Sequence, residues 1–403
     1  MKSITLWFAC LVVVVAALPR VRAAEKAGAV DPSSISNPAG FEIRRGVNLS
    51  HWLSQNFGWS PRDTFITEKD LRYLKSIGYD HVRIPIDEKE LWTEDGKPSA
   101  EAFAYLTKAI EACQAIGLRA VVDLHTVRAH HFNAANEGGK NTLFTNPKAQ
   151  ETFLKLWTDI SSYLKKYPES LLAYEIMNEP VADEAQQWNA LVARAFTTLR
   201  ALEPNRVLVI GSNRWQTAEN FPALEVPAGD SNIILSVHTY EPLPFTHYKA
   251  AWMPSKDYSG PVHYPGVTIT PEDYDRFVDQ KNQALVGLFW RARQSFDKQK
   301  LAEILRPAIE KARQLHLQLY CSEFGCLPTV PRKDRLAYYR DIIAVFEENG
   351  LAWANWEYKA DFGILPYDTV KQQAGPPDQE LIDVLLHPSA DGKNEKSSGE
   401  PHR

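Results

Sequence analysis

Two glutamates, Glu179 and Glu323, each follow an apolar segment of the chain. Glu179 comes after the apolar segment 171–177 and before Pro180, which restricts both its own backbone and that of the residue preceding it. Glu323 follows a second apolar segment, 317–321. Two carboxylates that face one cleft can cleave a glycosidic bond, because one protonates the leaving oxygen while the other attacks the anomeric carbon or activates a water. The alternative for the first site is an ordinary strand-to-loop turn.

The two carboxylates would need different protonation states. Glu179 needs a raised pKa to hold its proton, and the nearby charge of Glu323 would raise it, because like charges resist simultaneous ionisation. Glu323 must stay ionised, and Arg83 is a candidate to hold it with its forked guanidinium. Tyr240 is a second candidate donor to the same carboxylate. These assignments predict a general acid/base at Glu179 and a nucleophile or base at Glu323.

Strand-like and helix-like segments alternate along the chain and would position these residues. This alternation predicts a parallel sheet, and eight repeats favour a closed (β/α)8 barrel in a single domain over an open doubly wound sheet. No Gly-rich phosphate loop follows any predicted strand, which disfavours the open sheet. The predicted strands are 43–48, 81–86, 119–124, 171–177, 207–210, 232–237, 317–321 and 352–356.

The carboxyl ends of barrel strands converge on one face, where the active sites of such barrels lie. Polar and ionisable residues gather at the predicted strand ends. Only the fifth end, near Ser212 and Asn213, offers no candidate catalytic or binding residue. An amide or imidazole there can bind sugar hydroxyls, and an indole offers a flat surface for a pyranose ring. Besides the two glutamates, the candidates at these ends are Asn48, Arg83, His125, Asn178, His238, Tyr240 and Trp356.

The chain ends predict export from the cytoplasm. Residues 1–23 have a charged start, an apolar run and a small-residue cleavage site, as in a secretory signal, and an uncleaved anchor is the minority alternative. We expect an exposed arm at 24–40, a catalytic domain at 41–386 and a disordered polar tail at 387–403. Such a protein would be secreted or periplasmic and free of the membrane after cleavage, and a monomer is expected.

Charge and cysteine content exclude some functions. The 403-residue chain has a formal charge of −5, and cleavage of the leader would remove three basic residues and no acidic one. An acidic surface is a poor match for nucleic acid. Cys113, Cys321 and Cys326 would remain, too few for a disulfide framework, although Cys321 and Cys326 could pair or stay as buried thiols.

The combination of strand-end motifs resembles glycoside hydrolase family 5, a group of retaining barrel glycosidases that includes many cellulases. The resemblance implies that Glu179 is the acid/base and Glu323 the nucleophile, with net retention and no cofactor or metal. It also implies that Arg83 and Tyr240 support the nucleophile, while Asn178, His125, His238 and Trp356 surround the sugar. The matching motifs are Arg45-Gly46-Val47-Asn48-Leu49, His81-Val82-Arg83-Ile84-Pro85, Asp123-Leu124-His125, Asn178-Glu179-Pro180, His238-Thr239-Tyr240, Ser322-Glu323-Phe324-Gly325 and Trp356.

The resemblance defines the reaction better than the substrate. Endo-β-1,4-glucanase is the first choice, and β-mannan, xyloglucan or β-1,3-glucan are alternatives, with endo or exo attack. The irregular insertion at 241–270 would shape the cleft. A catalytically inactive carbohydrate-binding barrel remains open, whereas a metal-dependent hydrolase and a serine hydrolase lack their motifs.

Overall fold

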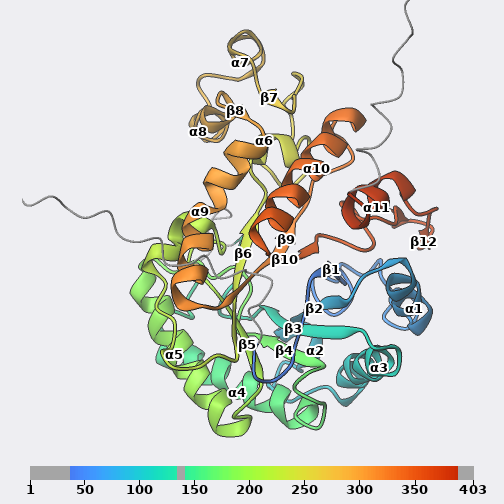
Figure 1. The fold of residues 1–403 in the computed structure, drawn as a ribbon, viewed down its shortest axis with the longest axis vertical. Coiled ribbons are helices and arrows are strands. Elements are labelled where there is room, and N and C mark those ends of the chain that lie inside the picture. Colours follow the sequence, from blue (N-terminus) through green and yellow to red (C-terminus); the bar gives the residue numbers. More distant parts are fainter. Residues whose placement is uncertain (1–36, 134–140, 389–403) are drawn as a thin grey trace, which may run out of the picture.

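The computed structural model describes residues 37–133 and 141–388, which form an eight-stranded closed barrel surrounded by helices (Figure 1). All neighbouring barrel strands pair in parallel, in the order β1-β10-β9-β6-β5-β4-β3-β2. The predicted (β/α)8 barrel is therefore confirmed. Its strands are β1 (Arg45–Asn48), β2 (His81–Asp87), β3 (Arg119–Thr126), β4 (Leu172–Glu175), β5 (Val207–Gly211), β6 (Ile233–Thr239), β9 (Gln318–Phe324) and β10 (Ala352–Asn355).

Most helices between the strands begin or end at a capping residue that is visible in the sequence. Ser99 accepts a hydrogen bond from Ala102 N at the start of α3, and Asn146 caps α4 just before Pro147. Gly117 and Gly350 end α3 and α10 in the left-handed conformation that glycine adopts without strain. The main helices are α1 (Glu68–Ile77), α3 (Ala100–Ile116), α4 (Pro147–Leu164), α5 (Ala185–Leu202), α9 (Lys298–Leu315), α10 (Arg332–Asn349) and α11 (Gln379–Leu386).

Two crossovers depart from the simple repeat. Between β5 and β6 the described chain forms a short 3-10 helix, η2 (Ala218–Ala223), in place of an α-helix. Between β6 and β9 it leaves the barrel before α9, and Figure 1 shows this excursion standing apart at the top. The excursion comprises α6 (Leu243–Thr246), β7 (Gly266–Val267), α7 (Pro271–Phe277), α8 (Gln283–Ala292) and β8 (Ser295–Phe296). Short elements elsewhere are α2 (Glu88–Leu91), β11 (Tyr367–Asp368) and β12 (Gln373–Ala374).

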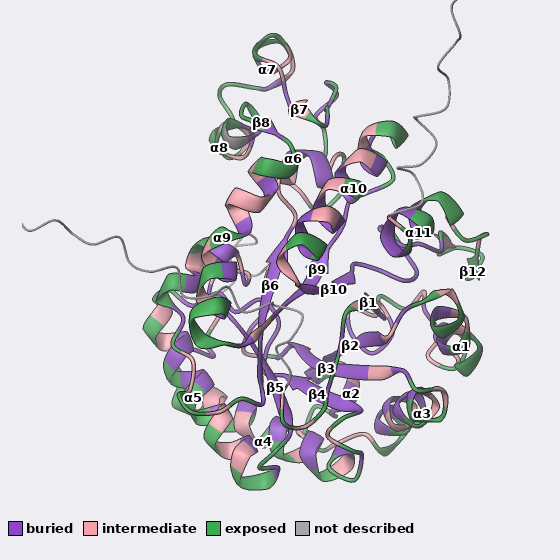
Figure 2. Ribbon diagram, in the orientation of Figure 1, coloured by how far each residue is buried: buried purple, intermediate pink, exposed green. Residues whose placement is uncertain are grey.

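The barrel interior changes from apolar to polar along the strand direction. Strands such as β2 and β6 are buried along their whole length, and Figure 2 shows the barrel strands mostly in the colour of buried residues. Helices cover the outside of the barrel and side chains fill its inside. Val121 on β3 and Ala173 on β4 belong to an inner apolar cluster with Phe41 and Ile43. Two residues further along each strand, on the same face, the side chains are acidic: Asp123 and Glu175. The polar layer faces the carboxyl-end mouth.

Several expectations concern the chain ends. The predicted signal at 1–23 lies outside the described residues, as do the arm and tail except for 37–40 and 387–388. Among the described helices, none combines the length and apolarity that a membrane span requires. Cys321 and Cys326 are free, buried thiols, which answers the question of pairing that the sequence leaves open.

Candidate active site

The pairing of barrel strands is irregular at two places, between β6 and β9 and between β2 and β3, and this changes which side chains face the barrel mouth. Opposite Val237 and His238 of β6, the partner residues on β9 jump from Cys321 to Glu323, so that Ser322 is an extra residue. A β-bulge of this kind re-aims the side chains beside it. Ser322 and Glu323 therefore both reach interior partners although they are adjacent in sequence. The pairing of β2 with β3 skips His125 in the same way.

Arg83 lies at the centre of the polar layer. The sequence prediction put it at a strand end, but β2 continues to Asp87, and Arg83 is fully buried inside the barrel. Its Nε donates to Oε2 of Glu175 at 2.7 Å, and Nη2 lies 3.0 Å from Oδ2 of Asp123. Burial works against the charge of Arg83, but Asp123, Glu175 and Glu323 outweigh it and raise its pKa. The arginine is therefore a fixed positive charge.

Glu323 receives a donor on each carboxylate oxygen. Nη1 of Arg83 donates to Oε1 at 2.7 Å, and the Tyr240 hydroxyl donates to Oε2 at 2.9 Å. The same Nη1 donates to Oδ1 of Asn48 at 2.9 Å, which fixes the guanidinium plane. Both predicted supports of this carboxylate lie against it.

Glu179 lies beyond its strand instead of ending it. β4 ends at Glu175, two residues before the end of the predicted strand 171–177, so Glu179 lies four residues past the strand end. Asn178 N still donates to Leu124 O of β3, which keeps the intervening chain beside the barrel. Glu179 itself has a φ of 41°, uncommon for a residue with a side chain, and its N–H donates to Oε1 of Gln216 at 2.8 Å.

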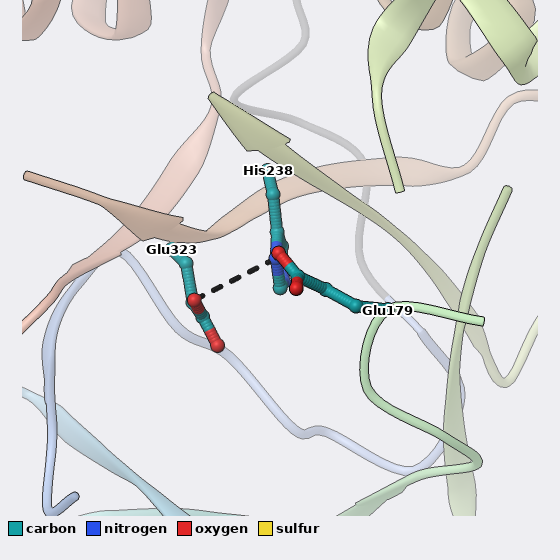
Figure 3. A group of neighbouring side chains, drawn as sticks. All are labelled: Glu179, His238 and Glu323. Atoms are coloured by element: carbon teal, nitrogen blue, oxygen red, sulfur yellow. Dashed lines mark hydrogen bonds and ion pairs between the residues drawn. The ribbon is translucent and has the colours of Figure 1, made fainter. Parts of the chain in front are cut away.

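His238 lies between the two glutamates in Figure 3, and the three side chains form one cluster. Its Nδ1 is 2.9 Å from Oε1 of Glu179 and 3.7 Å from Oε2 of Glu323. One oxygen of each glutamate and a ring nitrogen all lie within 4.8 Å of one another. Carboxyl groups of retaining glycosidases are about 5–5.5 Å apart, against about 6.5–9.5 Å in inverting ones. The spacing fits direct attack by one carboxylate.

Burial and charge give the two carboxylates unequal proton affinity. Burial raises the pKa of Glu179 well above its ordinary value, and the charge of Glu323 raises it further. The sequence alone indicates only the like charge, because burial depth cannot be read from a linear motif. Burial also raises the pKa of Glu323, but the charge of Arg83 and a hydrogen bond from Tyr240 oppose that rise. Between the two, the proton belongs on Glu179.

The histidines at the mouth are neutral. Burial, followed by the charge of Arg83, holds the pKa of His238 well below its ordinary value. Burial also lowers the pKa of His125 to about 4. His238 therefore adds no full positive charge that would pull the proton from Glu179, and its Nε2 lies 2.8 Å from Oγ of Ser322.

The remaining predicted site residues surround the same mouth. Asn178 accepts from Nη2 of Arg83 at 2.9 Å through its side-chain oxygen, while its buried Nδ2 has no partner in the described structure. A sugar hydroxyl is the kind of group that would satisfy this amide. The Trp356 ring lies parallel to His125, with 5.6 Å between centroids. Trp356 is only 8% exposed, so a small part of the indole is open to a ligand.

Three further residues complete the site and were missed by sequence reasoning. Asp123, which the sequence analysis quotes only as part of a motif, lies within β3, and Glu175 is the last residue of β4. Buried strands seldom contain acidic residues, and that anomaly was the signal available for both. Gln216 lies in the loop after β5, near the one predicted strand end for which the sequence offers no candidate. No local pattern marks it, because its partners Glu175 and Glu179 come from a different strand and loop.

The cluster of Glu179, His238 and Glu323 also has the spacing of a cation site. Both oxygens of Glu323 already accept hydrogen bonds, one of them from a guanidinium. A divalent cation at this position would have to compete with the charge of Arg83. The donor set therefore fits acid–base chemistry better than a metal centre.

Comparison with known proteins agrees with this chemistry. The family model described as cellulase (glycosyl hydrolase family 5) matches residues 37–362. Endoglucanase C of Acetivibrio thermocellus is 30% identical over 351 residues, covering 85% of this chain and 98% of that protein. Cellodextrinase A of Ruminococcus flavefaciens is 28% identical, covering 77% and 84% respectively. The solved structure of endoglucanase Cel5A from Thermotoga maritima superposes with a TM-score of 0.66 at 24% identity, covering 89% of this chain and all of the other, and shows the same fold.

Proposed function

Because the chain belongs to the cellulase family, glycosyl hydrolase family 5, it is an O-glycosyl hydrolase, and we propose that it cleaves internal β-1,4 bonds of a glucan with retention of configuration. The observation that carries the proposal is the approach of Glu179 and Glu323 to within 4.8 Å, with Arg83 and Tyr240 on Glu323 alone. The relatives named endoglucanase and cellodextrinase support a β-1,4-glucan as substrate.

In the first step, Glu323 attacks the anomeric carbon while Glu179 gives its proton to the departing glycosidic oxygen. The C–O bond to the leaving sugar breaks as the bond to the Glu323 oxygen forms. Glu323 loses its negative charge in the glycosyl-enzyme, so the like-charge contribution to the pKa of Glu179 disappears. Glu179, now ionised, takes a proton from water, whose oxygen attacks the same carbon and releases Glu323.

The other site residues have supporting roles in this proposal. Asn178 offers its unpartnered Nδ2 to a hydroxyl beside the scissile bond, a contact that can strengthen in the transition state. Trp356 and His125 form the wall against which the sugar in the cleavage position would lie. His238 keeps the Glu179 carboxyl oriented through its 2.9 Å contact.

A polysaccharide panel with product analysis tests the proposal. We expect carboxymethylcellulose and cello-oligosaccharides to be cut internally, with products initially in the β configuration by proton NMR. Preferred cleavage of β-mannan, xyloglucan or a β-1,3-glucan would change the proposed substrate but not the mechanism. Initial α products would contradict double displacement. Binding without turnover of any substrate would favour an inactive carbohydrate-binding barrel, and loss of activity with a chelator would revive a metal-dependent hydrolase.

The predicted export and monomeric state belong to the same proposal. An enzyme acting on a polymer must meet it outside the cytoplasm, which agrees with the leader-like composition of residues 1–23. Amino-terminal sequencing of protein recovered from the medium or periplasm would test cleavage after residue 23. Light scattering would test the expected monomer.

A further inference from the structure

We propose that Gln216 is a positioning residue that holds Glu179 in place for proton transfer, an inference that rests on the function proposed above. Gln216 is fully buried, and its carboxamide has partners on both sides. Oε1 accepts from Glu179 N at 2.8 Å. Nε2 donates to Oε1 of Glu175 at 3.0 Å and to Oγ of Ser236 at 2.9 Å. One amide thus connects the acid's backbone to the polar layer.

The backbone of Gln216 holds the other partner of Glu179. His238 N donates to Gln216 O at 3.1 Å, and His238 Nδ1 is the group that contacts the Glu179 carboxyl. Gln216 therefore fixes the acid and the histidine beside it through two different groups. A shift of this residue would move both ends of the 2.9 Å contact.

The chain around Gln216 is built to admit its side chain. A Cβ on Gly211 would lie 2.2 Å from Nε2 and 2.4 Å from Cγ of Gln216, so only glycine leaves room there. Arg214, Trp215 and Gln216 have φ values of 58°, 60° and 54° in succession. Residues with side chains adopt this region at an energetic cost, and such outliers cluster at functional sites.

The same carboxamide connects the acid to the nucleophile. Glu175, which receives Nε2 of Gln216, accepts from Arg83, and Arg83 donates to Glu323. Replacing Gln216 would break this chain of hydrogen bonds at the acid, whereas Arg83 and Tyr240 would still hold Glu323. A misplacement of about 1 Å can lower a rate by about 100-fold, so the effect of losing Gln216 should be measurable.

Leaving-group dependence separates positioning of the acid from general damage to the fold. A dinitrophenyl leaving group departs without protonation, whereas a phenyl or sugar leaving group needs the acid. For Gln216→Met, we expect kcat/KM to fall by about 10–100-fold on phenyl β-cellobioside and cellotetraose. On 2,4-dinitrophenyl β-cellobioside it should change by about twofold or less, because attack by Glu323 is unaffected.

A second variant reaches the same contact from the opposite side. Gly211→Ala leaves Gln216 in the chain but occupies the space of its side chain, and it should give the same dependence on the leaving group. Asn213→Ala is the matched control, because Asn213 lies in the same loop and its amide binds Ala182 N and O at 2.8 and 3.1 Å. It should affect both substrate types equally.

Glu179→Gln is the reference for interpretation. If Glu179→Gln shows the leaving-group dependence while Gln216→Met and Gly211→Ala slow both substrates equally, the positioning role is wrong and the proposed function stands. If Glu179→Gln itself shows no such dependence, the assignment of the acid fails. Thermal unfolding of each variant confirms that folded enzyme is compared.

Discussion

The end of β9 and the loop after β4 present the same side chain to the same cleft, yet they surround it differently. Glu323 accepts hydrogen bonds from Arg83 and Tyr240, one on each oxygen. The Glu179 carboxyl contacts the neutral His238, and its backbone, not its carboxyl, is held by Gln216. Donors stabilise a carboxylate, and burial without donors stabilises the carboxylic acid. The surroundings, not the residue type, therefore distinguish the proposed nucleophile from the proposed acid.

The two sets of contacts also differ in how much freedom they leave to the carboxyl groups of Glu323 and Glu179. A nucleophile has one target atom, so fixing both oxygens aids attack. An acid that later acts as a base must exchange protons with a leaving group and with water, so its carboxyl needs access. Glu179 is 8% exposed and Glu323 4%, a difference in the expected direction. Preorganisation is thus strong on one side of the cleft, whereas on the other it consists of the backbone hydrogen bond to Gln216 and one contact of the carboxyl with His238.

Removal of the nucleophile should have the largest effect. Glu323→Ala is expected to lower kcat by at least about 10⁴-fold, since it removes the carboxylate that is proposed to attack the anomeric carbon. Added azide should restore part of the activity by entering the space of the lost side chain. Steady-state kinetics with an activated aryl cellobioside would measure both effects.

An independent test labels the carboxylate itself. A 2-fluoro cellobioside with an activated leaving group should form a stable adduct that mass spectrometry finds on Glu323. An adduct on another residue would show that Glu323 is not the nucleophile and would contradict the contrast between the two carboxylates.

The next effect concerns the acid and its pH dependence. Activity requires Glu323 ionised and Glu179 protonated, so the rate should fall in acid as Glu323 gains a proton and in base as Glu179 loses one. Because burial raises the pKa of Glu179 well above its ordinary value, the basic limb should lie far above the titration range of a free glutamate. Glu179→Gln should remove this limb and lower kcat/KM by about 10³-fold on substrates with poor leaving groups. A basic limb that persists would point to another acid.

The features of the fold and site that can be predicted from the sequence are those that depend on local sequence patterns. Ser99 and Gly117, residue types that favour helix ends, cap the two ends of α3. The alternation of strands and helices defines the barrel, and the convergence of strand ends then brings Glu179 and Glu323 together. Each inference needs only neighbours in sequence and one topological rule.

The unpredicted part depends on register and burial. Strand pairing places Ser322 as an extra residue and ends β4 at Glu175, and neither is determined by the residues nearby. Gln216 lies near the strand end for which the sequence offers no candidate, and it is recognisable only through its partners on other segments. Burial as the main cause of the raised pKa of Glu179 likewise emerges only from the packed barrel.

A substitution of the shared guanidinium should sharpen the comparison. Arg83→Lys keeps a positive charge but cannot reach Glu175, Glu323 and the Asn48 oxygen together, because an ammonium lacks the planar fork. We expect kcat to fall by about 100-fold. With one donor to Glu323 weakened, the pKa of Glu323 should rise, and the acidic limb of the pH profile should move toward higher pH. An unchanged acidic limb would show that Arg83 does not control Glu323 ionisation.

The smallest expected effect leaves both carboxylates with their partners. Trp356→Ala removes the indole beside His125, and we expect kcat/KM on cello-oligosaccharides to fall by about 10-fold, or about 1.4 kcal/mol. KM should rise and kcat should fall together, because the sugar in the cleavage position would be both less tightly bound and less well oriented. Trp356→Phe is the matched control and should recover most of the loss. Both limbs of the pH profile should stay in place, since neither Glu179 nor Glu323 hydrogen-bonds the indole; a shifted limb would mean that Trp356 acts through burial of a carboxyl and not through the sugar.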